Sequence, residues 1–104
     1  MRTVEVRARA LVDIEGAATY ISVVFDSPNA AEHTMDAIIA SIKQAAELPE
    51  LGRIFICKGL ATSYRRVLSG KYWIFYTFTD ETLTVWRIVH VTQDVDRYGF
   101  DSFE

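Results

Sequence analysis

Residues 64–91, YRRVLSGKYWIFYTFTDETLTVWRIVHV, carry apolar side chains with the period of two that is typical of β-strands. Two polar interruptions, Ser69-Gly70-Lys71 and Asp80-Glu81, contain residues that favour tight turns. They divide the stretch into strands at 64–68, 72–79 and 83–91. Because short turns join antiparallel neighbours, the sequence predicts a three-stranded meander.

The middle strand of this meander is apolar on both faces. One face would carry Tyr72, Ile74, Tyr76 and Phe78, and the other Trp73, Phe75 and Thr77. A strand that is buried on both sides belongs in the interior of a sheet. We therefore expect strand 72–79 to be central, with one of its faces packed on helices.

The region before the meander has the apolar spacing of helices. From about Ala8, spacings of three and four residues place one apolar stripe on Leu11, Ile14, Ala18, Ile21 and Phe25. Ser27 is a natural N-cap and Pro28 suits the first position of a second helix. That helix would run to about Glu47 with the stripe Ala31, Met35, Ile38, Ile42 and Ala45. The pair predicts an antiparallel helical hairpin.

The remaining segments complete an α+β fold that forms a single domain over residues 1–104. Val4 and Val6 alternate with polar residues and predict a short edge strand. Residues 48–59 are interrupted by Pro49, Gly52 and Gly59 and predict a loop, with a short strand at 54–57. After Val91, residues 94–98 suit a single helical turn and residues 99–104 a frayed tail.

The composition excludes several classes of protein. Half of the 104 residues are apolar and 24% are charged, as in ordinary globular domains and unlike disordered chains. The longest uncharged stretch, residues 16–25, is too short to span a bilayer. The first residues lack the apolar run of a secretory signal, and the single Cys57 forms no intrachain disulfide. We therefore expect a cytoplasmic protein without a membrane partner.

The charge is unevenly distributed. The chain has a net charge of −3, yet residues 53–79 contain five Lys or Arg and no Asp or Glu. This asymmetry predicts a local basic docking surface; alternatively, the charges only solvate the sheet and its loops. Only two histidines are present, far apart in the sequence, so no metal site and no cofactor are expected.

Specific residues resemble a known family. They include Ala10, Asp13 and Ile14 in the first helix, followed by Tyr20-Ile21, Ser27-Pro28, Ala30-Ala31 and LPELGR at 48–53. The later part contributes YRR at 64–66, GKYWIFY at 70–76, VWRIVH at 85–90 and Asp94. Together these motifs resemble the RelE/ParE superfamily of toxins from bacterial type II toxin-antitoxin systems, closer to its ParE-like, plasmid-stabilisation branch.

The resemblance implies a growth-inhibiting toxin that a cognate antitoxin neutralises. ParE-like members poison DNA gyrase, and RelE-like members cleave messenger RNA on the ribosome. This chain departs from the RelE pattern at Trp73, where an arginine is usual, and Gln93 stands near the place of a second arginine. A net negative charge also disfavours a protein that must approach RNA. We therefore expect a gyrase-binding inhibitor that is not an enzyme.

Two alternatives stay open. One is a metal-independent, ribosome-dependent endoribonuclease that uses His90, Arg66 and Tyr98 for acid-base chemistry. The other is a degenerate family member that binds an antitoxin without toxicity. The chain could act as a homodimer or as part of a toxin-antitoxin heterotetramer.

The candidate site residues follow from these expectations. For target binding they are Arg65, Arg66, Lys71, Arg87 and His90; for antitoxin binding they are Trp73, Phe75 and Trp86. Each has a structural alternative. Arg87 in an apolar strand would otherwise form an ion pair or snorkel to the surface, and His90 would bond to a loop or to Asp94. Trp73 and Trp86 would otherwise belong to the core.

Overall fold

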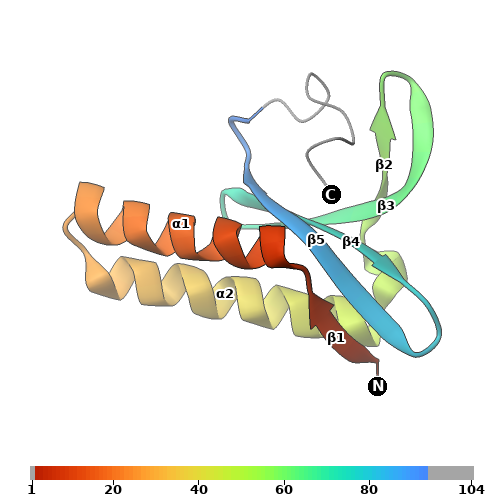
Figure 1. The fold of residues 1–104 in the computed structure, drawn as a ribbon, viewed down its shortest axis with the longest axis horizontal. Helices are drawn as coiled ribbons and strands as arrows, with labels where there is room; N and C mark the ends of the chain where they lie inside the picture. Colours follow the sequence, from red (N-terminus) through yellow and green to blue (C-terminus); the bar gives the residue numbers. More distant parts are fainter. Residues whose placement is uncertain (1, 94–104) are drawn as a thin grey trace.

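In the computed structural model, which describes residues 2–93, a helical hairpin packs on one face of a five-stranded sheet (Figure 1). This is the α+β architecture that the sequence predicts. In chain order the elements are β1 (Thr3–Val6), α1 (Ala8–Val24), α2 (Pro28–Glu47), the 3-10 turn η1 (Pro49–Leu51), β2 (Arg53–Cys57), β3 (Leu60–Ser69), β4 (Tyr72–Phe78) and β5 (Thr82–His90).

The sheet has the strand order β1-β5-β4-β3-β2. The predicted meander is confirmed as β3, β4 and β5, with β4 central, and β1 lies at an edge as expected. Strand β1 pairs with β5 in parallel, with Val6 opposite Val85. The sequence did not predict this pairing, because a short alternating strand carries no information about its neighbour.

The loop predicted at 48–59 is more ordered than expected. The short strand is confirmed as β2, and β3 begins at Leu60, so the two strands form a hairpin. Lys58 and Gly59 have φ angles of 53° and 80°, and a two-residue hairpin turn requires such left-handed conformations. The Lys58-Gly59 pair thus marks a hairpin turn and not the end of ordered structure.

The helical hairpin is confirmed, and its second helix begins as predicted. The Ser27 hydroxyl accepts a hydrogen bond from the Ala30 N–H at 3.2 Å, and Pro28 is the first helical residue. The stripe predicted for α1 is partly wrong, because Leu11 is 49% exposed and Phe25 63% exposed. The buried residues of α1 include Ala10 and Ala17 instead. Because α1 carries apolar residues around much of its surface, their spacing does not identify the buried face.

The core lies between the hairpin and the sheet. It is formed by Ala10 from α1, by Ile38, Ile42, Ala45 and Ala46 from α2, and by Ile74, Tyr76, Leu83, Val85 and Ile88 from the sheet. A second cluster, Phe55, Cys57, Phe75 and Val89, belongs to the opposite face of the sheet, which we call the outer face. Strand β4 therefore contributes to both clusters, as its two apolar faces predict.

Neither helix within residues 2–93 is long and apolar enough to cross a membrane. The helical turn predicted at 94–98 and the frayed tail at 99–104 lie outside the described residues.

Candidate functional site

Arg66 lies on the outer face of β3 within a group of aromatic rings. Its guanidinium carbon is 4.1 Å from the centroid of the Trp73 ring and 5.3 Å from that of Phe55. A third ring, Phe75, is 6.0 Å away. A guanidinium over aromatic faces is stabilised by cation–π attraction. The arrangement holds a partly exposed cation at a defined place on the sheet.

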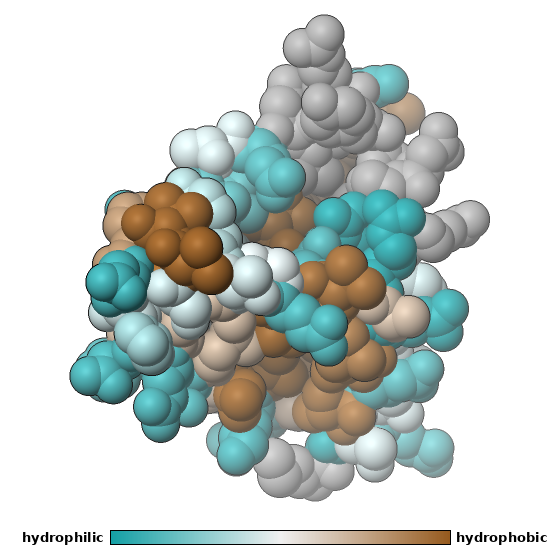
Figure 2. Space-filling view, turned by 60° about the vertical axis from the view of Figure 1, so that its left-hand side comes forward, coloured by the Kyte–Doolittle hydropathy of each residue, from teal (hydrophilic) through white to brown (hydrophobic). Residues whose placement is uncertain are grey.

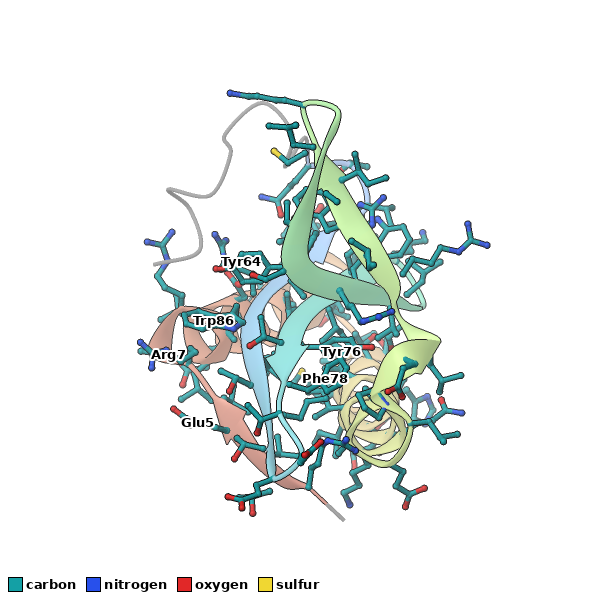
Figure 3. All side chains as sticks on the ribbon, turned by 90° about the vertical axis from the view of Figure 1, so that its right-hand side faces the viewer. Glu5, Arg7, Tyr64, Tyr76, Phe78 and Trp86 are labelled. Atoms are coloured by element: carbon teal, nitrogen blue, oxygen red, sulfur yellow. The ribbon has the colours of Figure 1, made fainter. Side chains whose placement is uncertain are left out.

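Trp86 forms a second cation–aromatic group beside it. Its indole N–H donates to Thr77 Oγ1 at 2.9 Å, and the Tyr64 ring meets it edge to face at 5.9 Å between centroids. The Arg7 guanidinium lies 4.8 Å from the Trp86 ring. Figure 3 shows Tyr64, Trp86 and Arg7 together on one side of the sheet, with Tyr76 and Phe78 directed to the other. These contacts partly bury Trp86.

The aromatic residues of the outer face differ in how much of their surface a partner protein could contact. Phe75 is 0% exposed, so the antitoxin contact predicted for it does not fit its burial. Trp73 and Trp86 are half-buried and already engaged, as the alternative reading of the sequence as core aromatics suggests.

Arg65, the neighbour of Arg66, points to the helix face. Its Nη1 donates to the Gly52 carbonyl at 2.8 Å, and its guanidinium carbon is 5.7 Å from the Phe78 ring. Consecutive strand residues alternate between faces, so the two arginines cannot act in one patch.

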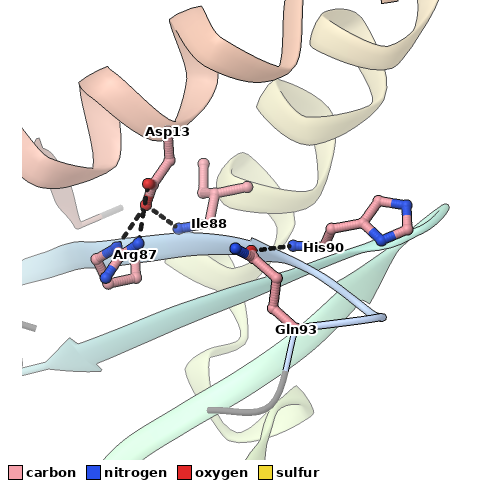
Figure 4. A network of polar contacts seen from close by, with 5 residues as sticks. All are labelled: Asp13, Arg87, Ile88, His90 and Gln93. Atoms are coloured by element: carbon pink, nitrogen blue, oxygen red, sulfur yellow. Dashed lines mark hydrogen bonds and ion pairs between the residues drawn. The ribbon is translucent and has the colours of Figure 1, made fainter. Parts of the chain in front are cut away.

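Arg87 is paired within the fold. Its Nε and Nη2 donate to the two carboxylate oxygens of Asp13 at 2.6 and 3.0 Å, and the Ile88 N–H donates to the same carboxylate at 2.9 Å (Figure 4). The side chains of Arg87 and Asp13 are only 13% and 15% exposed. The β4–β5 register shifts between Phe75, which is opposite Arg87, and Tyr76, which is opposite Val85. The structural alternative for Arg87 is thus realised.

His90 ends β5 on the helix side of the sheet. Its Nδ1 lies 2.8 Å from Thr92 Oγ1, and its ring meets Tyr72 edge to face at 5.3 Å. The alternative of an imidazole bonded to a loop is therefore observed, with Thr92 as the partner.

His90 and Arg66, the two described residues of the proposed endoribonuclease site, are not in contact. His90 is opposite Tyr72 and Arg66 opposite Phe75, so the two positions are separated by about 10 Å along β4. They also lie on opposite faces of the sheet. Tyr98 is outside the described residues.

Two adjoining hollows flank α1. One of about 420 Å³ lies between α1 and the end of β5, and one of about 670 Å³ lies between the hairpin and the β3–β4 turn. Tyr20, Tyr72 and His90 line both, so we treat them as one feature, the α1 groove. Lys71 lines its outer end. Burial, with a smaller contribution from Tyr20, raises the pKa of Tyr72 above 10.0, so the phenol is neutral at physiological pH.

Part of the exposed apolar surface of residues 2–93 lies on α1, beside the α1 groove. Exposed fractions there reach 65% for Val12, 54% for Tyr20 and 73% for Val23. Figure 2 turns the free end of the hairpin forward and shows apolar side chains gathered in patches on this side. Large exposed apolar patches mark interaction sites. Sequence reasoning placed this surface on the sheet, although the uncharged stretch 16–25 was a signal for α1.

Within residues 2–93, no three His, Cys, Asp or Glu side chains lie close enough together to hold a metal ion. The thiol of Cys57 is buried.

Comparisons with known proteins agree with this architecture. A family model described as the ParE toxin of the type II toxin-antitoxin system parDE matches residues 4–95. A chain in the solved structure "Chromosomal ParDE TA system from P. aeruginosa" superposes with a TM-score of 0.66 at 13% sequence identity, covering 86% of this chain and 96% of that one. At this identity the structural match speaks for the fold alone. A search of curated proteins found no significant match.

Proposed function

Because the chain belongs to the ParE toxin family of type II toxin-antitoxin systems, we propose that it inhibits growth by binding DNA gyrase and that a cognate antitoxin neutralises it. The observation that carries the proposal is the family match over residues 4–95, which spans every described helix and strand except Thr3, the first residue of β1. The site geometry supports an activity based on binding.

The arrangement of polar groups disfavours phosphodiester cleavage. Acid-base catalysis needs its groups within hydrogen-bond reach of one substrate. His90 and Arg66 occupy opposite faces of the sheet, and Arg87 is neutralised by Asp13. Trp73 stands where an arginine is usual in the RelE pattern. It packs against the Arg66 guanidinium and supplies no cation. The residues are therefore better suited to hold a partner than to break a bond.

We place the antitoxin in the α1 groove. Tyr20 and Phe25 lie edge to face with 5.7 Å between their centroids, and both are more than half exposed. An apolar helix face laid against them and Tyr72 would remove this surface from water. Trp73 and Trp86 lie on the outer face of the sheet, so an antitoxin would contact them only by continuing from the groove around the sheet, and Phe75 packs beneath them.

We place the gyrase contact on the cations that stay accessible. Lys71 is exposed on the β3–β4 turn, and its carbonyl accepts from the Val91 N–H at 2.9 Å, so it lies next to His90 at one end of the sheet. Arg66 presents its charge on the outer face. Arg65 and Arg87 are engaged inside the fold, by the Gly52 carbonyl and by the Asp13 carboxylate, so they are not part of the proposed contact.

A supercoiling assay tests the target. Purified chain should inhibit gyrase, and Lys71→Glu should weaken the inhibition at least tenfold. Lys43→Glu, the same charge reversal on an exposed residue of α2, is the control and should inhibit like the unmodified chain. Undisturbed supercoiling over a wide concentration range would refute the gyrase assignment. Ribosome-dependent RNA cleavage that His90→Ala abolishes would favour the endoribonuclease instead.

Co-purification tests the antitoxin site. With the antitoxin encoded beside this chain, Tyr20→Asp and Phe25→Lys should each weaken the complex at least tenfold. Ile39→Lys, at a position of α2 that is 46% exposed and does not line the groove, should leave the complex intact. Equal weakening by all three substitutions would contradict the location of the site.

A further inference from the structure

The larger hollow of the α1 groove has the dimensions of a small-molecule site. Its volume is about 670 Å³, and it lies between the hairpin and the β3–β4 turn. Sites for drug-sized ligands measure about 300–1,000 Å³ and combine an apolar lining with a few polar groups. The apolar lining here comes from both helices and from β4: Tyr20, Ile21, Phe25, Ala30, Ala37 and Tyr72. The hollow can therefore hold a ligand with a flat apolar body.

Ser69 is a buried polar residue in the wall of this hollow. It ends β3 and is only 7% exposed, and within residues 2–93 its hydroxyl has no hydrogen-bond partner. Buried hydroxyls are normally hydrogen-bonded, because an unsatisfied one destabilises the fold. The described chain contains no fully enclosed polar side-chain atom without a partner, so this hydroxyl reaches solvent through the hollow. It is therefore available to a ligand there.

Hydrogen-bond donors from three other elements line the same hollow. Lys71 is exposed on the β3–β4 turn, His33 is exposed on α2, and His90 ends β5. The His90 Nδ1 accepts a hydrogen bond from the Thr92 N–H at 3.2 Å, so the proton of the neutral ring is on Nε2, which can donate. The hollow thus combines a hydroxyl, an ammonium group and imidazole N–H groups, all of which can donate to an anion.

The charge at the hollow is positive, although the chain as a whole carries −3. Among the described residues that line it, Lys71 is a cation and none is acidic. Asp13 lines only the smaller hollow, where its carboxylate is bound to Arg87. Glu32 and Asp36 lie near His33 along α2 but are not among the lining residues. This local charge favours a negatively charged group.

We propose that this hollow binds a small molecule that combines flat apolar rings with one anionic group. The rings would lie against Tyr20 and Phe25, and the anion would accept hydrogen bonds from Ser69 Oγ, Lys71 Nζ and His90 Nε2. Because the antitoxin is placed in the same groove, ligand and antitoxin would exclude each other. Binding to the free chain depends on neither the antitoxin nor the gyrase assignment, so its test is independent of both.

Two fluorescent compounds test the proposal on the purified full chain. The anionic probe is 8-anilinonaphthalene-1-sulfonate, and N-phenyl-1-naphthylamine has the same rings without the sulfonate. The anionic probe should bind at least tenfold more tightly than the neutral one, although apolar surface alone would favour the neutral compound. Added salt should weaken the anionic probe only. In NMR spectra the anionic probe should shift the amide signals of residues 69–72.

Variants separate this hollow from other surfaces. Ser69→Ala and Lys71→Gln should each weaken the anionic probe at least threefold and leave the neutral compound unaffected. Ser69→Ala should not lower the stability in urea, because its hydroxyl has no partner within residues 2–93. Lys58→Gln removes an exposed charge from the β2–β3 turn, outside the hollow, and should bind both compounds normally. If circular dichroism shows that Ser69→Ala is unfolded, Lys71→Gln alone decides.

Several results would overturn the proposal. Equal affinity for the two compounds would show that the hollow recognises apolar surface and no anion. Unchanged binding of the anionic probe to both Ser69→Ala and Lys71→Gln would place its site elsewhere, as would shifts confined to the outer face. Shifts of residues 69–72 on raising the protein concentration alone would show that a second copy of the chain fills the hollow.

Discussion

The Asp13 carboxylate holds Arg87 with two hydrogen bonds, of 2.6 Å from Nε and 3.0 Å from Nη2. The pair stands where β1 has ended at Val6 and the chain has turned into α1. Strand β5 continues past that point, so its Ile88 N–H needs an acceptor other than a strand, and Asp13 supplies it at 2.9 Å. The Asp13 carboxylate thus links α1 to β5, and it accepts the hydrogen bond from the Ile88 N–H that β1 is too short to accept.

Replacement of Asp13 by alanine should therefore be costly. Asp13→Ala leaves the largely buried Arg87 without its carboxylate, and breaking such a pair costs about 3 kcal/mol of unfolding free energy. Adding Arg87→Met should recover part of that loss, because the charge that Asp13 balanced is then removed as well. Urea unfolding measures both, with Asp36→Ala on the exposed side of α2 as the control. A loss below about 1 kcal/mol for Asp13→Ala would show that the pair contributes as little as a surface ion pair.

Local patterns in the sequence predicted most of the fold. The alternation through 72–79 placed β4 at the centre, and Ser27-Pro28 placed the start of α2. Pairings between distant segments could not be predicted in this way. The parallel contact of β1 with β5 depends on where α1 leads the chain, and nothing in the periodicity of Val4 and Val6 encodes that.

Surface properties were harder to predict than elements. Trp73, Phe75 and Trp86 are large and apolar, which suits a core as well as an interface, and only the packing around them decides how much is exposed. The opposite error occurred for α1, where Leu11 and Phe25 were assigned to the buried stripe. Asp13 was part of the family resemblance, but its pairing with Arg87 bridges 74 positions and leaves no local signal.

Gly52 should tolerate no side chain while Tyr76 keeps its hydroxyl. The Tyr76 hydroxyl donates to the Pro49 carbonyl at 2.6 Å and accepts from the Gly52 N–H at 3.0 Å. A Cβ on Gly52 would overlap this hydroxyl. We expect Gly52→Ala to lower the unfolding free energy by about 2 kcal/mol, in the range of overpacked cores.

A double-mutant cycle checks the cause. In a Tyr76→Phe background the hydroxyl is absent, so Gly52→Ala should cost clearly less than it does alone. Gly16→Ala is the matched control, because a Cβ there meets no atom within 4 Å. Additive effects of Gly52→Ala and Tyr76→Phe would exclude the hydroxyl as the source of strain.

Tyr76 should also make the protein less stable at high pH. Burial raises the pKa of this phenol and outweighs the hydrogen bond from Gly52 and the charge of Arg65, which lower it. Above about pH 10 the unfolded chain loses the proton while the folded chain retains it, so the unfolding free energy falls as the pH rises. Below that pH both states are protonated and the free energy is unaffected.

Urea unfolding between about pH 8 and pH 11 measures this dependence. The slope for the unmodified chain should exceed that for Tyr76→Phe by up to about 1.4 kcal/mol per pH unit above pH 10. Tyr76→Phe also removes two buried hydrogen bonds, so the slopes and not the absolute values are compared. Parallel curves for the two proteins would mean that the phenol ionises equally in both states.

Arg66 and Trp73 should be energetically coupled, since the guanidinium carbon stands 4.1 Å from the ring centroid. Partly exposed cation–π pairs contribute about 0.5–1 kcal/mol. The unfolding free energies of Arg66→Met, Trp73→Leu and the double variant should therefore show a coupling of that size. Arg53→Met, at the position opposite Arg66 on β2, should show no coupling with Trp73→Leu.

If Arg66 also contacts gyrase, Arg66→Met should reduce inhibition far more than this small loss of stability explains, whereas a purely structural Arg66 would leave inhibition unchanged in the folded variant.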